Sequence, residues 1–249
     1  MITTIIIMGT TITTAITIMT ESISPSLSPL ALSRLLQLAS PMLPVGAYSY
    51  SQGLESAIET GYVRDAATAS QWIADVLTLY LGRFELPLLC RMCEALSNGE
   101  DPELWNAVYC AGRDTAEGRA ETLQMGYSLM RLLRDLDSAA AVTPTDMATP
   151  HISFPLAFAK AAVAWKIPAD TCVQAYAWSW LENQVAAAMK AIPIGQVAGQ
   201  RILLAIGAMI PDVVACATIL PENDISNFAP GLTLAACRHE VQYSRLFRS

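Results

Sequence analysis

The chain has 249 residues, of which 53% are hydrophobic and 15% are charged, and it carries a net charge of −7. That length can bury a sizeable core as one large domain. The mean hydropathy of +0.38 leaves two classes open, a membrane protein or a protein that hides apolar surface in partners. The acidic balance, with a pI of about 4.8, argues against a nucleic acid as partner.

A membrane-spanning helix needs about 20 consecutive apolar residues. The best candidate, residues 197–220, is interrupted by Gln200, Arg201, Pro211 and Asp212. The uninterrupted part is only long enough for a core helix. The sequence therefore predicts no membrane partner.

Residues 1–28 form an Ile- and Thr-rich leader. It lacks the basic region and the small-residue cleavage pattern of a signal peptide. Its β-branched residues suit a strand, but no second strand pattern exists with which it could pair. We therefore expect the leader to be disordered, or to lie upstream of a true start at Met19. Residues 29–249 are expected to form the folded domain.

From Pro29 onward, apolar residues recur at helical spacing. The first expected helices span residues 30–38, 51–60, 65–96 with a kink or division at Pro87, 101–114 and 115–136. After a flexible loop at 137–150, the expected helices span residues 155–165, 168–191, 193–210, 211–220 and 232–245. About ten helices and no other strand pattern predict an all-α fold in a single domain.

Six cysteines are present, mostly inside apolar segments: Cys90, Cys93, Cys110, Cys172, Cys216 and Cys237. Without a secretory signal, we interpret them as free buried thiols in a reducing compartment. Cys90 and Cys93 have the spacing of a metal or redox pair, which Cys237 and His239 could in principle complete. Their helical segment favours core thiols instead.

The other polar residues supply no convincing catalytic group. His239 and Glu240 are adjacent in a helix, where neighbouring side chains diverge. Glu55 and Glu59 share a helix face, most simply as solvated surface. Lys190 lies in an Ala-rich run, and its ammonium either reaches solvent or makes a fixed contact with a partner or an internal carboxylate.

The most distinctive part of the chain is the turn segment (residues 44–55), Pro-Val-Gly-Ala-Tyr-Ser-Tyr-Ser-Gln-Gly-Leu-Glu. Its turn-forming residues, aromatics and hydroxyls exceed what a plain connector needs, and they predict a contact surface. A second distinctive stretch, residues 181–201, reads Leu-Glu-Asn and later Pro-x-Gly-Gln-x-x-Gly-Gln-Arg. A third has Ala-Pro-Gly at 229–231, Arg-His-Glu at 238–240, and the tail (residues 245–249), Arg-Leu-Phe-Arg-Ser.

In this order and spacing, the three stretches resemble the urease accessory protein UreF family over about residues 30–249. Ala47-Tyr48 departs from an expected Gly-Phe but keeps the aromatic, and the leader lies outside the family pattern. The resemblance implies an all-α, cytoplasmic, non-enzymatic accessory protein that needs no cofactor and forms a homodimer. It also implies binding to the accessory protein UreD (also called UreH) and recruitment of the GTPase UreG. The assembly would load nickel into apo-urease, with the UreF-like chain modulating the GTPase.

We map the partner interface implied by the resemblance onto Pro44, Gly46, Tyr48, Ser51, Gly53, Leu54, Glu55, Lys190, His239, Glu240, Arg245, Leu246, Phe247, Arg248 and Ser249. The tail has the aromatic and arginine composition of an anchor, and a free chain end orders on binding, so we expect it to dock on UreD. Lys190 is a candidate for coupling to the GTPase. Two alternatives stay open, a helical metal-binding protein or carrier that uses the cysteines and His239, and a helical scaffold of unrelated role.

Overall fold

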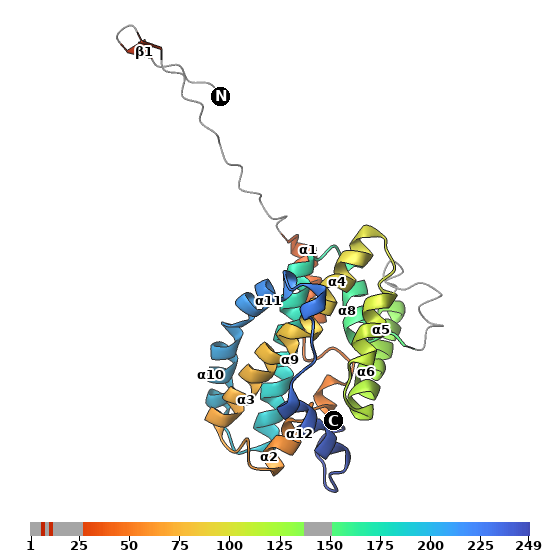
Figure 1. The fold of residues 1–249 in the computed structure, drawn as a ribbon, viewed down its shortest axis with the longest axis vertical. Helices are drawn as coiled ribbons and strands as arrows, with labels where there is room; N and C mark the ends of the chain where they lie inside the picture. The colour runs from red at the N-terminus through yellow and green to blue at the C-terminus, as the bar shows by residue number, and fades with distance from the viewer. Residues whose placement is uncertain (1–5, 8–9, 12–26, 137–150) are drawn as a thin grey trace.

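The computed structural model describes residues 6–7, 10–11, 27–136 and 151–249. The predicted all-α fold is confirmed (Figure 1). The α-helices are α1 (Pro29–Leu38), α2 (Leu54–Glu59), α3 (Ala66–Leu79), α4 (Glu85–Asn98), α5 (Glu103–Ala111), α6 (Ala116–Asp135), α8 (Phe154–Ala164), α9 (Ala169–Ala191), α10 (Gln196–Gly207), α11 (Ile210–Thr218) and α12 (Pro230–Glu240). Short 3₁₀ helices are η1 (Ala47–Ser49), η2 (Leu81–Arg83) and η3 (Glu222–Asp224).

Helix α9 is the central element of the fold. Helices α2, α3, α4, α8, α10 and α11 all pack against it, and in Figure 1 α10 and α11 lie on the opposite side of the molecule from α5 and α6. The sequence explains this position, because apolar residues of α9 are distributed around the helix rather than along one stripe. Val173, Leu181, Val185 and Ala188 are among its buried residues.

Several helices begin where the sequence supplies a capping side chain. The hydroxyls of Ser28, Thr115 and Ser153 accept hydrogen bonds from main-chain N–H groups in the first turns of α1, α6 and α8. Asp65 and Thr68 form a capping box at the start of α3. Such a cap stabilises a helix by about 1 kcal/mol. Local sequence therefore sets these starts.

The division between α3 and α4 lies earlier than we predicted. The chain turns through η2 at residues 80–84, and Pro87 lies within the first turn of α4 rather than at a kink. A proline there removes no intrahelical hydrogen bond, because first-turn N–H groups have no partner within the helix. Tyr80, Leu81 and Phe84 are buried, so tertiary packing sets the break.

Other helix ends also differ from the prediction. Helix α10 begins at Gln196, after Pro193 rather than at it, with extended backbone at Ile192 and Gly195. Helix α12 ends at Glu240 rather than at Arg245, because the residues beyond it turn toward α2 and bond there.

Part of the leader pairs with itself. Strands β1 (Ile6–Ile7) and β2 (Thr10–Thr11) are antiparallel, with Ile6 opposite Thr11 and Ile7 opposite Thr10. Our expectation that a leader strand would find no partner was therefore wrong. The other leader residues up to 26, and the predicted flexible loop at 137–150, lie outside the described residues.

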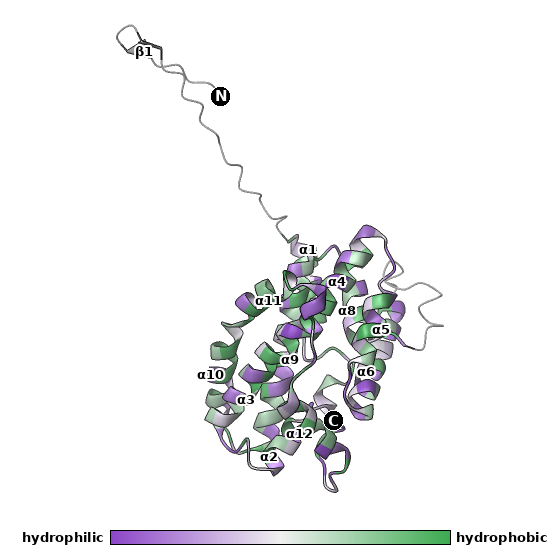
Figure 2. Ribbon diagram, in the orientation of Figure 1, coloured by the Kyte–Doolittle hydropathy of each residue, from purple (hydrophilic) through white to green (hydrophobic). Residues whose placement is uncertain are grey.

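Within the described ranges, one stretch, Gln196–Thr218, has the length and composition of a membrane-spanning helix. The chain turns at Ala208 and Met209, so this stretch consists of α10 and α11, which both pack on α9. Its residues are largely hydrophobic (Figure 2), and Val197 and Leu204 are exposed. An exposed apolar face of this kind is suited to contact with another protein.

All six cysteines are free. Cys90, Cys93, Cys110 and Cys172 are buried as predicted, whereas Cys216 and Cys237 are exposed. Burial raises the pKa of the Cys90 thiol to about 11, which keeps it protonated at neutral pH.

Candidate functional site

The turn segment owes its shape to left-handed backbone at Gly46, Gln52 and Gly53, whose φ angles are 82°, 53° and 83°. Gly46 directly precedes η1. Tyr48, within η1, is exposed, whereas Tyr50, just after η1, is buried. At Gly53 an added Cβ would lie 3.2 Å from a main-chain nitrogen of α12. Glycine is therefore required there for both its φ angle and its size. This close approach brings α12 against the start of α2.

The tail folds back on the turn segment. The main-chain oxygen of Ser249 accepts hydrogen bonds from the N–H groups of Ser51 (2.6 Å) and Gln52 (3.0 Å). It also accepts one from the Ser51 hydroxyl at 2.6 Å. The N–H of Arg248 donates to the main-chain oxygen of Ser49 at 2.8 Å. The first and third stretches of the resemblance thus bind each other directly.

Glu55 is the main attachment point of the tail. Its buried carboxylate accepts hydrogen bonds from the N–H groups of Leu246 (2.6 Å) and Phe247 (3.0 Å). Its Oε2 also lies 3.1 Å from Nε2 of His239. A buried carboxylate is costly unless donors surround it. The expectation of a solvated surface is therefore wrong for Glu55, whereas Glu59 is exposed.

His239 lies between two carboxylates and is fully buried. Its Nδ1 lies 2.9 Å from Oε2 of Glu117 in α6, opposite the contact with Glu55. Each ring nitrogen of the imidazole therefore lies within hydrogen-bond distance of a carboxylate oxygen. Glu117 also forms an ion pair with Arg245, and its N–H donates to the Glu240 carboxylate at 3.1 Å. Helices α2, α6 and α12 and the tail therefore meet at this point.

The second stretch of the resemblance reaches the same place from α9. The side-chain amide of Asn183 donates to the main-chain oxygen of Tyr50 at 3.0 Å. Just before this stretch, the indole N–H of Trp180 donates to Oε1 of Gln52 at 2.7 Å. Both bonds hold the turn segment against the central helix.

Lys190, near the end of α9, contacts the tail. Its Nζ lies 4.5 Å from the centroid of the Phe247 ring, a cation–π geometry. Lys190 is exposed to solvent, and its ammonium contacts an aromatic ring of the same chain rather than a carboxylate. Contact with a partner stays a prediction. All three stretches therefore converge on one junction, formed by the turn segment, α9, α12 and the tail.

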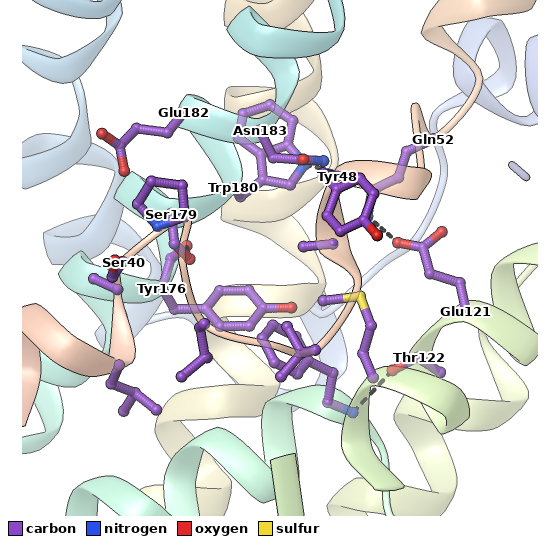
Figure 3. A pocket seen from close by; sticks show the side chains of 18 of the residues that line it. Ser40, Tyr48, Gln52, Glu121, Thr122, Tyr176, Ser179, Trp180, Glu182 and Asn183 are labelled. Atoms are coloured by element: carbon purple, nitrogen blue, oxygen red, sulfur yellow. Dashed lines mark hydrogen bonds between the residues drawn. The ribbon is translucent and has the colours of Figure 1, made fainter. Parts of the chain in front are cut away.

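A cavity of about 130 Å³ lies between the turn segment and helices α6, α8 and α9 (Figure 3). At one end, Glu121 of α6 accepts hydrogen bonds from the Gln52 amide (2.6 Å) and from the Ser249 hydroxyl (2.7 Å). Burial raises the pKa of the Glu121 carboxyl. Glu121 thus links the cavity to the tail. The Arg113 guanidinium also lines the cavity, but it donates to Glu85 at 2.5 Å.

The structure divides the predicted interface residues into exposed and buried sets. The exposed residues are Pro44, Tyr48, Lys190, Arg245, Leu246 and Arg248. Gly46 and Glu240 are half-buried. The buried residues are Ser51, Gly53, Leu54, Glu55, His239, Phe247 and Ser249. The buried set holds the junction together. We expected a free tail that orders on binding a partner, but the tail is bound to its own chain. Contact with a partner stays a prediction for both the exposed and the buried residues.

Five residues with polar side-chain groups in the junction were absent from the predicted interface: Gln52, Glu117, Glu121, Trp180 and Asn183. Gln52 and Trp180 lie beside residues that the sequence singled out, so they could have been included. Glu117 and Glu121 carry no local signal, because glutamates four residues apart are ordinary on a helix surface. Their role appears when α6 is placed against the tail.

The alternative metal site is not assembled. Cys90 and Cys93 are buried, Cys237 is exposed, and both ring nitrogens of His239 face carboxylates. Among the residues that the structure describes, no group of three or more His, Cys, Asp or Glu side chains is arranged to hold a metal ion. The metal-binding interpretation therefore has no support.

The UreF family model matches residues 63–207, more than half of the chain. The chain belongs to the UreF family. It is 57% identical over 222 residues to the urease accessory protein UreF of Methylobacillus flagellatus, which covers 88% of this chain and 98% of that protein. It is 54% identical over 233 residues to UreF of an Azoarcus species, covering 92% of this chain and 100% of that one.

A further relative combines two accessory functions in one chain. The bifunctional urease accessory protein UreEF of Bordetella bronchiseptica is 44% identical over 236 residues, which cover 92% of this chain and 54% of that protein. The resemblance to the UreF family, stated first from three short stretches, is confirmed by these matches.

Proposed function

We propose that this chain is a urease accessory protein whose junction binds other accessory proteins during nickel loading of apo-urease. The observation that carries the proposal is the convergence of the three family-like stretches on one junction, linked through Glu55, Asn183 and Lys190. The two relatives are urease accessory proteins, which supports a role in urease maturation. The role is binding rather than catalysis, and it is performed in the cytoplasm.

The proposed partners are UreD (UreH), the GTPase UreG and apo-urease, and the chain acts as a homodimer that modulates the GTPase. The exposed residues of the junction suit protein contact, because Tyr48 and Leu246 are 75% and 56% exposed. The tail, which carries Leu246, also carries the exposed Arg245 and Arg248. Aromatic and arginine side chains are enriched among residues that dominate binding energy. The fusion in the Bordetella relative supports association among accessory proteins.

A reconstitution with purified components tests this function. Apo-urease, nickel, GTP, UreD and UreG are incubated with and without this chain, and urease activity is measured. We expect activity to rise when the chain is present. Equal activity without it would contradict the proposal.

The contribution of the tail is tested by deleting residues 243–249. We expect the deletion to abolish co-purification of UreD while circular dichroism shows unchanged helix content. Removing the tail exposes the Glu55 carboxylate, so thermal unfolding is measured as a control for folding. Retained capture of UreD by the shortened, folded chain would contradict a role of the tail in binding.

A further inference from the structure

The cavity beside the junction has no role in the function proposed above. Its volume of about 130 Å³ resembles engineered cavities of about 150 Å³ that hold a benzene molecule. Sites for drug-sized ligands or cofactors are larger, at about 300–1,000 Å³. The cavity is therefore suited to a group the size of one side chain rather than to a nucleotide.

The inner wall of the cavity is apolar and aromatic. Leu38, Val45 and Met125 are buried and line it, together with the rings of Tyr176 and Trp180. Figure 3 shows the Tyr176 ring among the side chains that line the cavity. A methylene chain laid against such a wall loses contact with water and gains dispersion contacts.

The outer side of the cavity, on α9, carries hydrogen-bond acceptors. Glu182 and Asn183 are half-buried there. Burial raises the pKa of the Glu182 carboxyl, and a hydrogen bond with the Trp178 side chain opposes this rise. Glu182 takes part in none of the ion pairs among residues 27–136 and 151–249. The Asn183 amide N–H donates to the turn segment, which leaves its Oδ1 as an acceptor.

Three of the donor side chains that line the cavity are already engaged. The Arg113 guanidinium donates to Glu85, the Trp180 indole donates to Gln52, and the Gln52 amide donates to Glu121. A ligand that brings its own donors and a positive charge therefore complements the lining better than an anion does.

We propose that this cavity binds an alkylammonium group, the lysine side chain of a partner protein. The methylene stem lies against Tyr176 and Trp180, and the ammonium pairs with Glu182 at the outer side. There the ammonium keeps part of its hydration, as long cationic side chains do at the edge of apolar surfaces. Tyr48 lines the cavity and is 75% exposed, so its ring contacts the inserted stem from the solvent side. This proposal rests on the proposed function, which supplies the partner.

The ligand chemistry is tested on the isolated full-length chain with n-butylammonium chloride as the probe. The indole N–H resonance of Trp180 is followed by NMR, with sodium chloride and n-butanol as controls for salt and apolar binding. We expect a saturable shift with n-butylammonium, about fivefold weaker affinity in Glu182→Gln, and unchanged affinity in Glu100→Gln, an exposed glutamate outside the cavity. No saturable shift, or equal affinity in Glu182→Gln, would overturn the proposal.

The source of the ammonium is tested by capture of purified UreD and UreG. Glu182→Gln and the narrowing variant Ser179→Leu should each weaken capture, whereas Glu100→Gln should not. Unfolding curves verify that each variant is folded. If Ser179→Leu does not fold, the capture measured with Glu182→Gln alone decides the test. If n-butylammonium binds but Glu182→Gln captures UreD and UreG as well as the wild type does, the proposal that a partner's lysine fills the cavity is overturned. Failure of urease activation with the wild type would instead count against the proposed function, because the probe arm needs no partner.

Discussion

At the scale of single residues, the attachment of the tail depends on the ionised carboxylate of Glu55. It accepts two main-chain N–H groups from the tail and faces the ring of His239. One side chain therefore binds the main chain of two consecutive residues of the tail.

Replacing Glu55 with glutamine should therefore destabilise the protein. Gln has nearly the same shape, but it is neutral and presents an amide N–H₂ toward donors. Breaking a buried, hydrogen-bonded charge pair costs about 3–5 kcal/mol. We expect Glu55→Gln to lower the free energy of unfolding by about 3 kcal/mol, measured by urea titration.

Glu59 provides the matched control, because it lies on the same helix and is exposed. Glu59→Gln should change the free energy of unfolding by less than about 0.5 kcal/mol. Equal unfolding midpoints for the two variants would show that the Glu55 contacts contribute nothing to stability.

The buried carboxyl of Glu121 should make the free energy of unfolding depend on pH. Burial raises its pKa above the ordinary value of 4.5, so the folded protein holds this proton at a pH where the unfolded chain has released it. The resulting stabilisation is fully present below pH 4.5 and is lost as pH rises through the folded-state pKa. The stability of the wild type relative to Glu121→Gln should therefore fall as the pH rises above 4.5 in urea titrations. A relative gain in stability over this range would contradict the assignment.

At the scale of elements, the close approach of α12 to the start of α2 depends on Gly53. Gly53→Ala combines an unfavourable φ with an added Cβ 3.2 Å from the main chain of α12. Gly46 has nearly the same φ, 82°, but open space around its added Cβ. We expect Gly46→Ala to cost about 1–2 kcal/mol from backbone strain alone. Gly53→Ala should cost about 1 kcal/mol more in thermal or urea unfolding. Equal costs would indicate that α12 does not pack tightly there.

The existence of the helices was predictable from the sequence, because apolar periodicity and capping residues are local signals. Ser28 and Asp65 mark helix starts in this way. The position of the break at residues 80–84 was not predictable, since burial of Tyr80 and Phe84 rather than Pro87 determines it. The end of α12 was missed for the same reason, because the chain beyond Glu240 bonds to an element far away in the sequence.

The junction was predictable only in part. The turn segment and the tail were singled out by composition, and Lys190 by its place in an apolar run. That the tail binds the turn segment of the same chain, through Glu55, required the tertiary structure. Glu117 and Glu121 are surface-like by pattern, yet they contact His239 and Ser249 once α6 is in place.

At the scale of the whole molecule, the apolar composition is explained partly by the core around α9 and partly by exposed apolar surface. Val197 and Leu204 of α10 are 66% and 78% exposed and, seven residues apart, share a helix face. Helix α10 lies on the side of the molecule away from α5 (Figure 2). We propose this face as the contact between copies in the homodimer.

Leu204→Glu should therefore shift the protein from dimer to monomer, measured by light scattering after size-exclusion chromatography. A charge placed in the apolar centre of an interface is not solvated and repels its symmetry mate. Leu104→Glu is the matched control, because Leu104 is 64% exposed on α5. A dimer that survives Leu204→Glu would exclude this face.

We propose that the turn segment, α9 and the tail act as one binding site. A double-mutant cycle on the affinity for purified UreD tests it most directly, with Glu55→Gln, Phe247→Ala and the double variant compared by calorimetry. Because both residues hold the same tail, each single variant should bind UreD about tenfold more weakly than the wild type. The double variant should have about the same affinity as the single variant that binds less tightly. Fully additive losses, or unchanged affinity in both single variants, would contradict the claim.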